Sequence, residues 1–478
     1  MNAAYDVAVI GGGPAGLAAA TVATRYALAT VLFDEQSRPG GQRYGARTEN
    51  DGARAASSVL QSHDDELVTA FRRSGATAVF DATVWMARSR GDGLFEIGVA
   101  HGPPGARDVR LTSARALIVA TGAIARPFPV PGGTLRGVMT AADAAAHLRD
   151  AQSESNRRIV LAGTGLLLWE LAAEYLEVGV ALEALAVTTP RAQRWRALSG
   201  VWRVIASPDF LRGLALEQHV RRRVRVIRNV TSIVARGAGR VEALELETAR
   251  GIEVLRAEAL VLHQGLVPEM NFGSAIGCAY RWNDAQACFE PVVDAWGGST
   301  LAGVFFAGDA AAIAGAAAAK ASGELTALAV ANALGRIDSK ARDGAAEKPR
   351  AALRRALRAR GFSDVLHRPA DVYRIPRGDT IACRCENVTA EHVLATVRQG
   401  ASGPNQVKAF TRCGMGPCQG RACGLTVTEL IAREKKVSPA EVGYFRLRWP
   451  VKPIALRELA ALPTSVEAER AVARDAAL

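Results

Sequence analysis

Five of the seven cysteines crowd into one stretch near the end of the chain, and cysteine thiolates are ligands for soft metal centres. Cys383 and Cys385 form a CxC pair. Cys413 and Cys418 form a CxxxxC pair in a loop rich in glycine and proline, whose backbone N–H groups can turn toward sulfur. Four thiolates in two short loops favour a [2Fe-2S] cluster over zinc, whose structural sites prefer CxxC spacing. Zinc is the alternative, and Cys423 is a fifth thiol that could replace one of the four predicted ligands.

The remaining two cysteines lie far from this group in the sequence. Cys278 and Cys288 stand in apolar surroundings, and we expect them to be inert core residues. Because the chain shows no export signal before its first strand, the crowding predicts a metal site rather than a disulfide framework.

A glycine-rich turn near the start of the chain predicts a second chemistry, the binding of a dinucleotide diphosphate. An apolar strand, Tyr5–Ile10, runs into this turn, which opens an alanine-rich helix. The first glycine permits the tight turn, the second lets the backbone approach a pyrophosphate, and the third lets helix and strand pack closely. The helix N-terminus favours anions. We therefore expect cofactor contacts at Gly11, Gly13, Pro14, Ala15 and Gly16.

Two carboxylates follow where the motif needs an acceptor for a ribose hydroxyl. The second strand, Thr30–Phe33, ends in Asp34 and Glu35. The turn Pro39-Gly40-Gly41-Gln42 follows, and its glycines let the backbone come close to a bulky ligand, for which FAD is the natural candidate. We expect cofactor contacts at Gly41 and Gln42. A strand over residues 78–85 is expected to end near an adenine, with Val84 as a contact.

Two later strand ends also point to a flavin. The strand over residues 116–123 is apolar and closes on Thr121 and Gly122. A second apolar strand ends in Gly308 and Asp309, before a helix over residues 314–334. The Asp309 carboxylate can bind a ribityl hydroxyl, while the helix N-terminus can stabilise an anionic reduced flavin ring. Asp309 is also readable as the N-cap of that helix, and both roles can hold because they use different lone pairs.

Residues 157–188 repeat the opening pattern in degraded form. A strand leads into Gly163-Thr164-Gly165, but leucine takes the third glycine position, and Ala186 stands where a ribose-binding acid is expected. A missing acceptor would cost NADH about 1–3 kcal/mol. The nearby Arg191, Arg194 and Arg196 could instead attract a 2′-phosphate. We expect a structural second Rossmann-like domain, with nucleotide binding left open.

Composition is that of a large multidomain enzyme. The chain has 478 residues and a formal net charge of +12, much of which is local: residues 191–228 hold ten arginines. Without a nucleic-acid motif, such clusters indicate solvated faces or an acidic protein partner rather than DNA. No 18-residue apolar run is present, so we expect neither export nor a membrane-spanning helix, and predict a cytoplasmic protein.

These elements predict an α/β fold with two Rossmann-like dinucleotide-binding domains and a small helical [2Fe-2S] domain at the C-terminus. We expect the FAD-binding domain to be discontinuous and the proline-rich residues 126–132 to cross between domains. The expected ranges are 1–130 and 256–335 for the FAD-binding domain, 131–255 for the second domain, 336–375 for a basic linker, 376–445 for the cluster domain and 446–478 for a tail.

The glycine turn, the Asp34–Gln42 segment, the Thr-Gly strand end and the Gly-Asp strand end together resemble the flavoproteins of the glutathione and thioredoxin reductase family over residues 1 to about 335. That branch needs a redox-active cysteine pair beside the flavin, and this region has none, which argues against disulfide reduction. The C-terminal cysteine segment resembles the bacterioferritin-associated-ferredoxin type of [2Fe-2S] domain.

Together the two parts are similar to the alpha subunits of bacterial heteromeric flavin dehydrogenases, such as opine oxidases, D-hydroxyproline dehydrogenase, hydrogen cyanide synthase and, more distantly, sarcosine oxidase. The resemblance implies a flavoprotein beta subunit that carries the substrate site. In some complexes of this kind it also implies an FMN between the subunits and a small third subunit. It further implies an electron acceptor such as a quinone, and peripheral contact with the inner membrane through the complex. The alternative is a self-sufficient NAD(P)H-dependent reductase.

Overall fold

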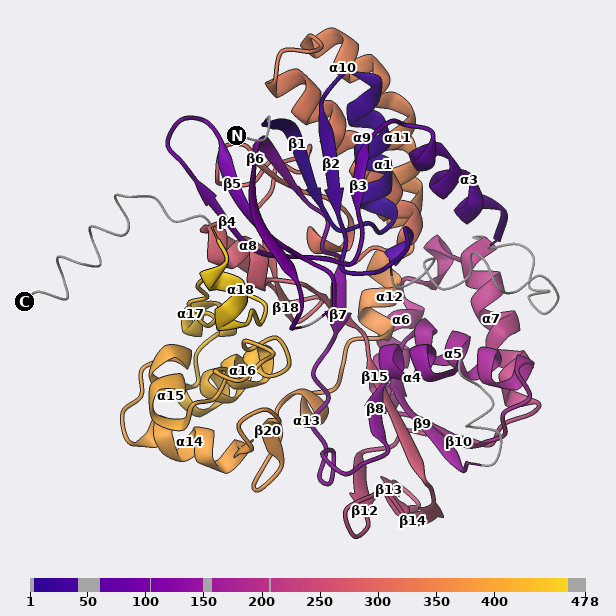
Figure 1. Ribbon diagram of the computed structural model, residues 1–478. Coiled ribbons are helices and arrows are strands. Elements are labelled where there is room, and N and C mark those ends of the chain that lie inside the picture. Colours follow the sequence, from indigo (N-terminus) through magenta and orange to yellow (C-terminus); the bar gives the residue numbers. More distant parts are fainter. Residues whose placement is uncertain (1–3, 42–60, 104, 149–156, 206–207, 463–478) are drawn as a thin grey trace, which may run out of the picture.

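The computed structural model describes residues 4–41, 61–103, 105–148, 157–205 and 208–462. Figure 1 shows two lobes built on separate sheets and a smaller, mainly helical lobe beside them. Among the described residues, no helix has the length and apolar character needed to cross a membrane.

The first lobe contains a seven-stranded sheet in the order β3-β2-β1-β6-β5-β4, with β19 beside β6. Strands β1, β2, β3, β6 and β19 run parallel, whereas β4, β5 and β6 form an antiparallel meander. The strands are β1 (Tyr5–Ile10), β2 (Thr30–Phe33), β3 (Thr77–Val79), β4 (Ala82–Ser89), β5 (Phe95–His101), β6 (Asp108–Val119) and β19 (Val304–Phe306).

Both faces of this sheet are covered, which explains why β1 is apolar throughout. Val7 and Val9 pack against α1 (Pro14–Arg25) and α9 (Ala316–Ala333), while Ala8 and Ile10 face the opposite core with residues of β4 and β5. A parallel strand buried on both faces loses the alternation of apolar and polar residues. Helix α3 (Gln61–Arg72) packs beside α1.

One predicted strand is broken in two. The range 78–85 is divided between β3 and β4 at Asp81, which has a left-handed φ of 51°. The backbone turns there because Asp81 and Ala82 donate hydrogen bonds to the carbonyls of Gln36 and Asp34 at 3.0 and 2.8 Å. The prediction of one continuous strand was therefore wrong.

The second lobe contains a fully parallel five-stranded sheet in the order β11-β10-β9-β15-β8. Its strands are β8 (Val138–Thr140), β9 (Ile159–Thr164), β10 (Leu182–Val187), β11 (Val226–Arg228) and β15 (Ala259–Gln264). Its helices are α4 (Ala141–His147), α5 (Leu166–Glu177), α6 (Arg191–Leu198) and α7 (Pro208–Arg221), with the 3-10 turn η2 (Val201–Arg203). Strand β15, which lies beyond the expected boundary at residue 255, belongs to this sheet because it pairs with β9 and β8.

An antiparallel sheet of β12 (Ser232–Arg236), β13 (Ala243–Thr248) and β14 (Gly251–Arg256) extends the second lobe. The two lobes are joined by the antiparallel pair of β7 (Ala123–Ala125) and β16 (Leu266–Pro268). The first lobe is completed by α8 (Asn271–Ile276), β17 (Tyr280–Asn283), β18 (Cys288–Pro291) and the 3-10 turn η3 (Gly308–Ala310).

The linker expected over residues 336–375 is helical. It forms α10 (Ser339–Ala345), α11 (Glu347–Leu357), α12 (Arg360–Leu366) and α13 (Asp371–Arg374). Its basic residues are partly used in packing: the Arg342 and Arg350 guanidinium groups lie 4.1 and 4.2 Å from the centre of the Trp296 ring. Figure 1 shows α12 between the two large lobes, next to α6.

The small lobe consists of the β20 (Ile381–Cys383) and β21 (Val388–Thr389) pair and the helices α14 (Ala390–Arg398), α15 (Pro404–Thr411), α16 (Gly424–Lys435) and α17 (Pro439–Val442). Apolar residues of α14, α15 and α16 form its own core. The described part of the expected tail packs on the first lobe: Val451 enters the core there, and α18 (Leu456–Ala460) contacts β6.

Candidate functional site

The glycine turn between β1 and α1 leaves an open space beside one of its three fingerprint glycines. A Cβ atom at Gly11 would collide with the Ala120 carbonyl, and one at Gly16 with the Gly11 carbonyl. A Cβ atom at Gly13 would meet nothing within 4 Å, although Gly13 sits directly at the start of α1. Gly11 and Gly16 therefore serve the packing of the turn, while Gly13 borders a space in front of the helix N-terminus that suits a phosphate.

The two predicted ribose carboxylates have different surroundings. Asp34 is 8% exposed, and its oxygens accept hydrogen bonds from the backbone N–H groups of Gly12 and Gln36. Burial raises the pKa of the Asp34 carboxyl, although these two N–H donors oppose the shift. Glu35 is exposed and pairs with the Lys452 ammonium at 2.9 Å. The contact with Lys452 joins positions far apart in the chain, and no sequence signal indicated it.

Further predicted residues gather at the same end of the sheet. Gly40 donates to the Gly12 carbonyl at 2.9 Å, so that Gly41 lies against Gly13. Gly308 packs against Ala15, because a Cβ atom on Gly308 would come within 2.7 Å of the Ala15 Cβ. The structure thus brings Gly41 and Gly308 to the glycine turn.

Two other predicted contacts are less direct. Val84 lies on β4 with its side chain buried in the core of the first lobe. Gln42 falls outside the described residues.

Thr121 and Asp309 frame the rest of this site. The Thr121 hydroxyl is buried and has no hydrogen-bond partner among the described residues, which is a cost unless a ligand or water supplies one. The Asp309 carboxylate accepts from the N–H groups of Ala314 and Gly315 at 2.9 and 3.1 Å. Gly315 is itself the N-cap residue of α9, so the prediction that Asp309 is the N-cap was wrong. Its carboxylate instead caps the turn that precedes the helix.

The corresponding cleft of the second lobe is occupied by the chain itself. The Thr164 hydroxyl, in the degraded fingerprint, lies 2.7 Å from the Thr189 hydroxyl and 3.4 Å from Nδ1 of His367, which follows α12. The Gln193 amide donates to the carbonyls of Val365 and Arg368 at 2.7 Å each. Linker residues 365–368 therefore lie between this fingerprint and α6.

Two histidines line that contact. His263, at the end of β15, is buried and His367 is half-buried, and desolvation lowers the pKa of each to about 4. Both side chains are thus neutral near pH 7. Of the three arginines expected to attract a 2′-phosphate, Arg194 donates to the Asn229 side chain at 2.8 Å.

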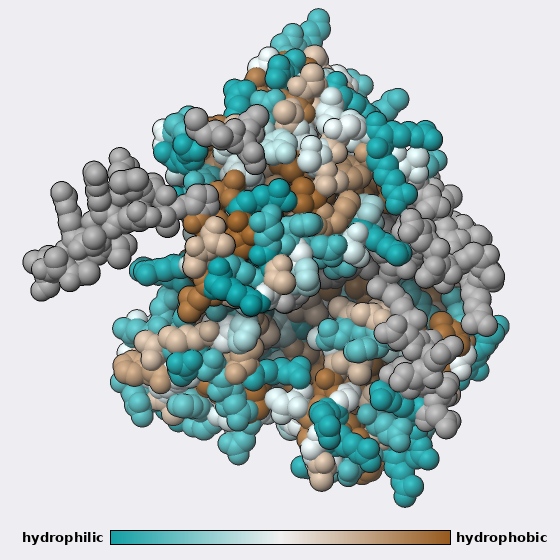
Figure 2. All heavy atoms as spheres, in the orientation of Figure 1, coloured by the Kyte–Doolittle hydropathy of each residue, from teal (hydrophilic) through white to brown (hydrophobic). Residues whose placement is uncertain are grey.

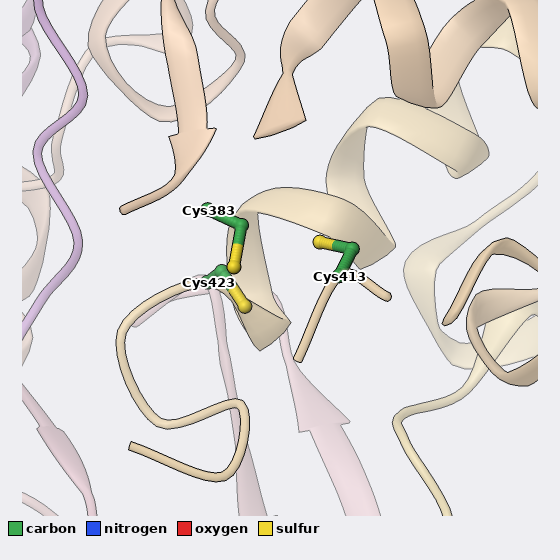
Figure 3. A group of neighbouring side chains, drawn as sticks. All are labelled: Cys383, Cys413 and Cys423. Atoms are coloured by element: carbon green, nitrogen blue, oxygen red, sulfur yellow. The ribbon is translucent and has the colours of Figure 1, made fainter. Parts of the chain in front are cut away.

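The cysteines of the small lobe converge as one triad and one pair. Cys383, Cys413 and Cys423 are buried, and their sulfur atoms all lie within 4.8 Å of one another. Figure 3 shows the three sulfurs pointing into a common space. Cys385 lies beside Cys418, whose backbone and side chain both hydrogen-bond to it. Cys423, which we expected only as a substitute ligand, is part of the tight group, because the turn before α16 returns it to Cys383.

Cys278 and Cys288 lie elsewhere and are buried, as expected. Burial raises the pKa of Cys278, and it raises the pKa of Cys288 to about 11. Both thiols stay protonated near neutral pH, which agrees with inert core residues.

The second cysteine loop docks directly on the first lobe. The Asn271 side-chain amide donates to the carbonyl of Gln419, the residue after Cys418, at 2.9 Å. The Asn271 N–H donates to the Glu269 carboxylate at 3.0 Å, and the Glu269 N–H donates to the Gly122 carbonyl at 3.1 Å. Two hydrogen bonds and a short piece of backbone thus connect Gly122 to Asn271, and a third reaches the cysteine loop.

The packing around this contact is apolar and well filled. Tyr444 and Leu425 of the small lobe join Met270 and Phe289 of the first lobe in one buried cluster. The Tyr444 hydroxyl donates to the Gly420 carbonyl at 3.2 Å. The position of the cysteine loop is therefore set by tertiary packing, which no local motif indicated.

Comparison with known proteins agrees with this architecture. The family model described as pyridine nucleotide-disulphide oxidoreductase matches residues 5–333, and the sarcosine oxidase A3 domain model matches residues 381–462. The chain therefore belongs to the pyridine nucleotide-disulphide oxidoreductase family and is an FAD-dependent oxidoreductase.

Within that family, it is a relative of opine oxidase subunits. The opine oxidase subunit of Rhizobium meliloti is 40% identical over 98% of this chain and 89% of its own length. That of Agrobacterium tumefaciens (strain Ach5) is 40% identical over 98% of this chain and 94% of its own. Among solved structures, L-proline dehydrogenase from P. horikoshii matches with a TM-score of 0.70 at 19% identity, over 96% of this chain and 79% of that one, which supports the fold. The predicted fold class and family resemblance are confirmed.

Proposed function

We propose that this chain is the FAD- and [2Fe-2S]-containing electron-transfer subunit of a heteromeric dehydrogenase or oxidase. The substrate, an amino acid, imino acid or opine, is oxidised on a partner flavoprotein subunit. This chain accepts the electrons and passes them to an acceptor such as a quinone. Both opine oxidase relatives are themselves named as subunits, which supports an assembly with at least one other chain.

In this proposal FAD occupies the space in front of Gly13. The N–H groups at the start of α1 hold the diphosphate, and the carboxylates of Asp34 and Glu35 accept hydrogen bonds from the ribose hydroxyls. Thr121, Gly122 and Asp309 border the flavin end, where the unpartnered Thr121 hydroxyl gains a polar neighbour. When bound, FAD supplies the exchange between two-electron and one-electron chemistry. The protein's part is to bind the cofactor, orient it and exclude water.

The cluster proposal uses the two cysteine loops. Cys385 and Cys418, which lie side by side, offer ligands for one iron, and two members of the buried triad offer ligands for the other. Cys383 and Cys413 remain our proposed ligands from the triad. Cys423 is the alternative to Cys413, because the sulfurs of both lie within 4.8 Å of the Cys383 sulfur.

The hydrogen bond between Asn271 and Gln419 is the observation that carries the proposed function. It joins the loop that holds Cys418 to the Glu269–Asn271 segment, which in turn contacts Gly122 at the proposed flavin site. A metal site with a purely structural role would not need a direct polar contact with the Glu269–Asn271 segment of the FAD-binding lobe. Two redox sites placed on either side of one packed interface suit electron transfer between them.

The alternative, an NAD(P)H-dependent reductase, meets an obstacle in α12. A nicotinamide must reach the flavin from the second lobe, and α12 lies between the two lobes. The Gln286 side chain of the first lobe contacts the Asp364 carboxylate of α12 at 3.4 Å and the Ile313 carbonyl at 3.2 Å. His367, the residue after α12, also contacts the Thr164 hydroxyl. In this proposal α12 therefore blocks the path by which a nicotinamide would reach the flavin.

We further propose the division into an FAD-binding part, a second Rossmann-like part, a helical linker and a cluster domain, with the second part extended to include β15. An FMN at a subunit interface, a small third subunit and peripheral contact with a membrane remain parts of the proposal that follow from the family resemblance. We also propose that the assembly acts in the cytoplasm.

The test is a spectrum of the anaerobically purified chain during reductant additions. We expect about two irons per chain if one cluster is bound. Dithionite should bleach both the flavin and cluster bands, whereas NADH and NADPH should leave the flavin band unchanged over minutes. Rapid bleaching by either nucleotide would favour the alternative reductase. Metal analysis that finds one zinc and no iron per chain would instead indicate that the small lobe holds a structural zinc site and carries no electrons.

A further inference from the structure

Residues 449–453, which we call the strap, follow the small lobe and lie against the first lobe. The Lys452 ammonium of the strap is 2.9 Å from Oε2 of Glu35, one of the two carboxylates that we assign to the ribose. The Val451 N–H donates to the carbonyl of Trp85 at 3.2 Å, on β4, which is part of the segment expected to end near an adenine. The strap therefore contacts both segments to which we assign the adenosine half of FAD.

Contacts on both sides of this lysine hold the strap in place. The Val451 side chain is buried in the core of the first lobe. The Trp449 ring packs edge-on against Phe272, with ring centres 5.2 Å apart. On the other side, the Arg107 guanidinium donates to the Pro453 carbonyl at 3.2 Å. The backbone that carries the lysine is thus anchored independently of the ion pair that the lysine makes.

The pair of Lys452 with Glu35 has more to offer a ligand than the fold. The two side chains are 30% and 47% exposed, and ion pairs in contact with water contribute little to stability. For a ligand, the pair restricts the long carboxylate side chain before the ribose arrives, which lowers the entropy lost on binding. The ammonium also balances a negative charge near the diphosphate site, and so reduces the repulsion of an anionic cofactor.

We propose that Lys452 is a positioning residue for FAD, which acts by holding the Glu35 carboxylate for the adenosine ribose. Oε2 stays with the ammonium, and Oε1 accepts hydrogen bonds from the ribose hydroxyls. The helix α18, which follows the strap, lies against the first lobe left of centre in Figure 1, and hydrophilic and hydrophobic atoms share the surface there in Figure 2. This inference rests on the proposed FAD site and adds to it a residue from outside the Rossmann-like lobes.

The experiment is a titration of the full-length chain, freed of flavin, with FAD. Lys452→Met keeps the length of the side chain and removes its charge, and it should raise the FAD dissociation constant about fivefold. Lys452→Arg keeps the charge and should stay within about twofold of the unmodified chain. The effect of Lys452→Met should shrink as salt is raised. In a Glu35→Gln background, Lys452→Met should cause no further loss, because its effect passes through that carboxylate.

The matched control is Arg88→Met, which breaks a 2.7 Å surface pair with Glu96 between β4 and β5 of the same lobe. It should bind FAD like the unmodified chain, and unchanged thermal unfolding of the flavin-free variants shows that each is folded. Unchanged FAD binding by Lys452→Met would overturn the inference and leave the FAD site in place. Equal loss in the control, or an undiminished effect of Lys452→Met in the Glu35→Gln background, would also overturn it. Full flavin occupancy in Gly13→Val would refute the FAD site itself, and this inference with it.

Discussion

Replacing Gly13 with valine should remove FAD while leaving the protein folded. A Cβ atom at this position meets no protein atom within 4 Å, and the backbone of Gly13 is extended, with φ of −74° and ψ of −177°. Valine adopts this conformation without strain. Its cost to the fold is the loss of a favourable N-cap residue, about 1 kcal/mol. Such a loss is small beside the roughly 5–15 kcal/mol that stabilises a typical domain.

The effect on the cofactor should be much larger. The valine side chain would fill the space in front of the first N–H groups of α1, where we place the diphosphate. Hydrogen bonds to a charged group are worth about 1.5–3 kcal/mol each, so the loss of two amounts to about 3–6 kcal/mol. That corresponds to a rise in the FAD dissociation constant of roughly a hundredfold to ten-thousandfold.

The assay is the ratio of flavin to protein absorbance after desalting, followed by titration of the flavin-free protein with FAD. The control is Gly344→Val, since a Cβ atom at Gly344 in α10 also meets nothing within 4 Å but lies away from the glycine turn. Thermal unfolding should be compared without flavin, because bound ligand raises the apparent stability. A Gly13→Val protein that purifies yellow with full flavin occupancy would refute the placement of FAD.

Two further predictions concern the small lobe and the second lobe. We expect Cys413→Ser to lose the visible absorbance of the cluster and Cys423→Ser to keep it, with FAD retained in both variants. Iron analysis checks this result. The opposite pattern would show that Cys423, and not Cys413, is the ligand. Because the pKa of His263 and His367 is lowered to about 4 from an ordinary value of 6.5, the unfolded chain binds more protons between these values. Stability should therefore be complete above pH 6.5 and fall toward pH 4, by up to about 1.4 kcal/mol per group and pH unit. Thermal unfolding between pH 7 and 5 should show this loss, with a shallower slope in His367→Asn; an unfolding temperature independent of pH would contradict it.

Much of the fold could be predicted because its signals are local. The strand, turn and helix around Gly11 to Gly16 follow from hydrophobic pattern and glycine spacing, and β1, β2 and α1 appear as expected. The degraded fingerprint at Gly163 likewise opens a second parallel sheet. Local patterns failed at Asp81, where hydrogen bonds to the segment that follows β2 divide a predicted strand in two.

The residue types of the candidate site were predictable from the sequence, but which of these residues lie next to one another was not. Cysteine spacing located the segment in which the thiols converge, yet spacing alone favoured Cys413 and Cys418 over Cys423. The structure places Cys423 within 4.8 Å of Cys383 and Cys413 because the chain turns back before α16. The reading of Asp309 as the helix N-cap failed, because its carboxylate accepts the N–H groups of Ala314 and Gly315 before the helix, and Gly315 is the capping residue.

By itself, the sequence determined which segments form the dinucleotide turn, the second Rossmann-like sheet and the cysteine loops, since each depends on residues close together in the chain. Only the tertiary structure decided what these segments face. The contact of Asn271 with Gln419, the pair of Lys452 with Glu35 and the position of His367 on Thr164 all join residues more than a hundred positions apart. Such contacts depend on how whole lobes pack, because complementary side chains far apart in sequence leave no periodicity or spacing to read.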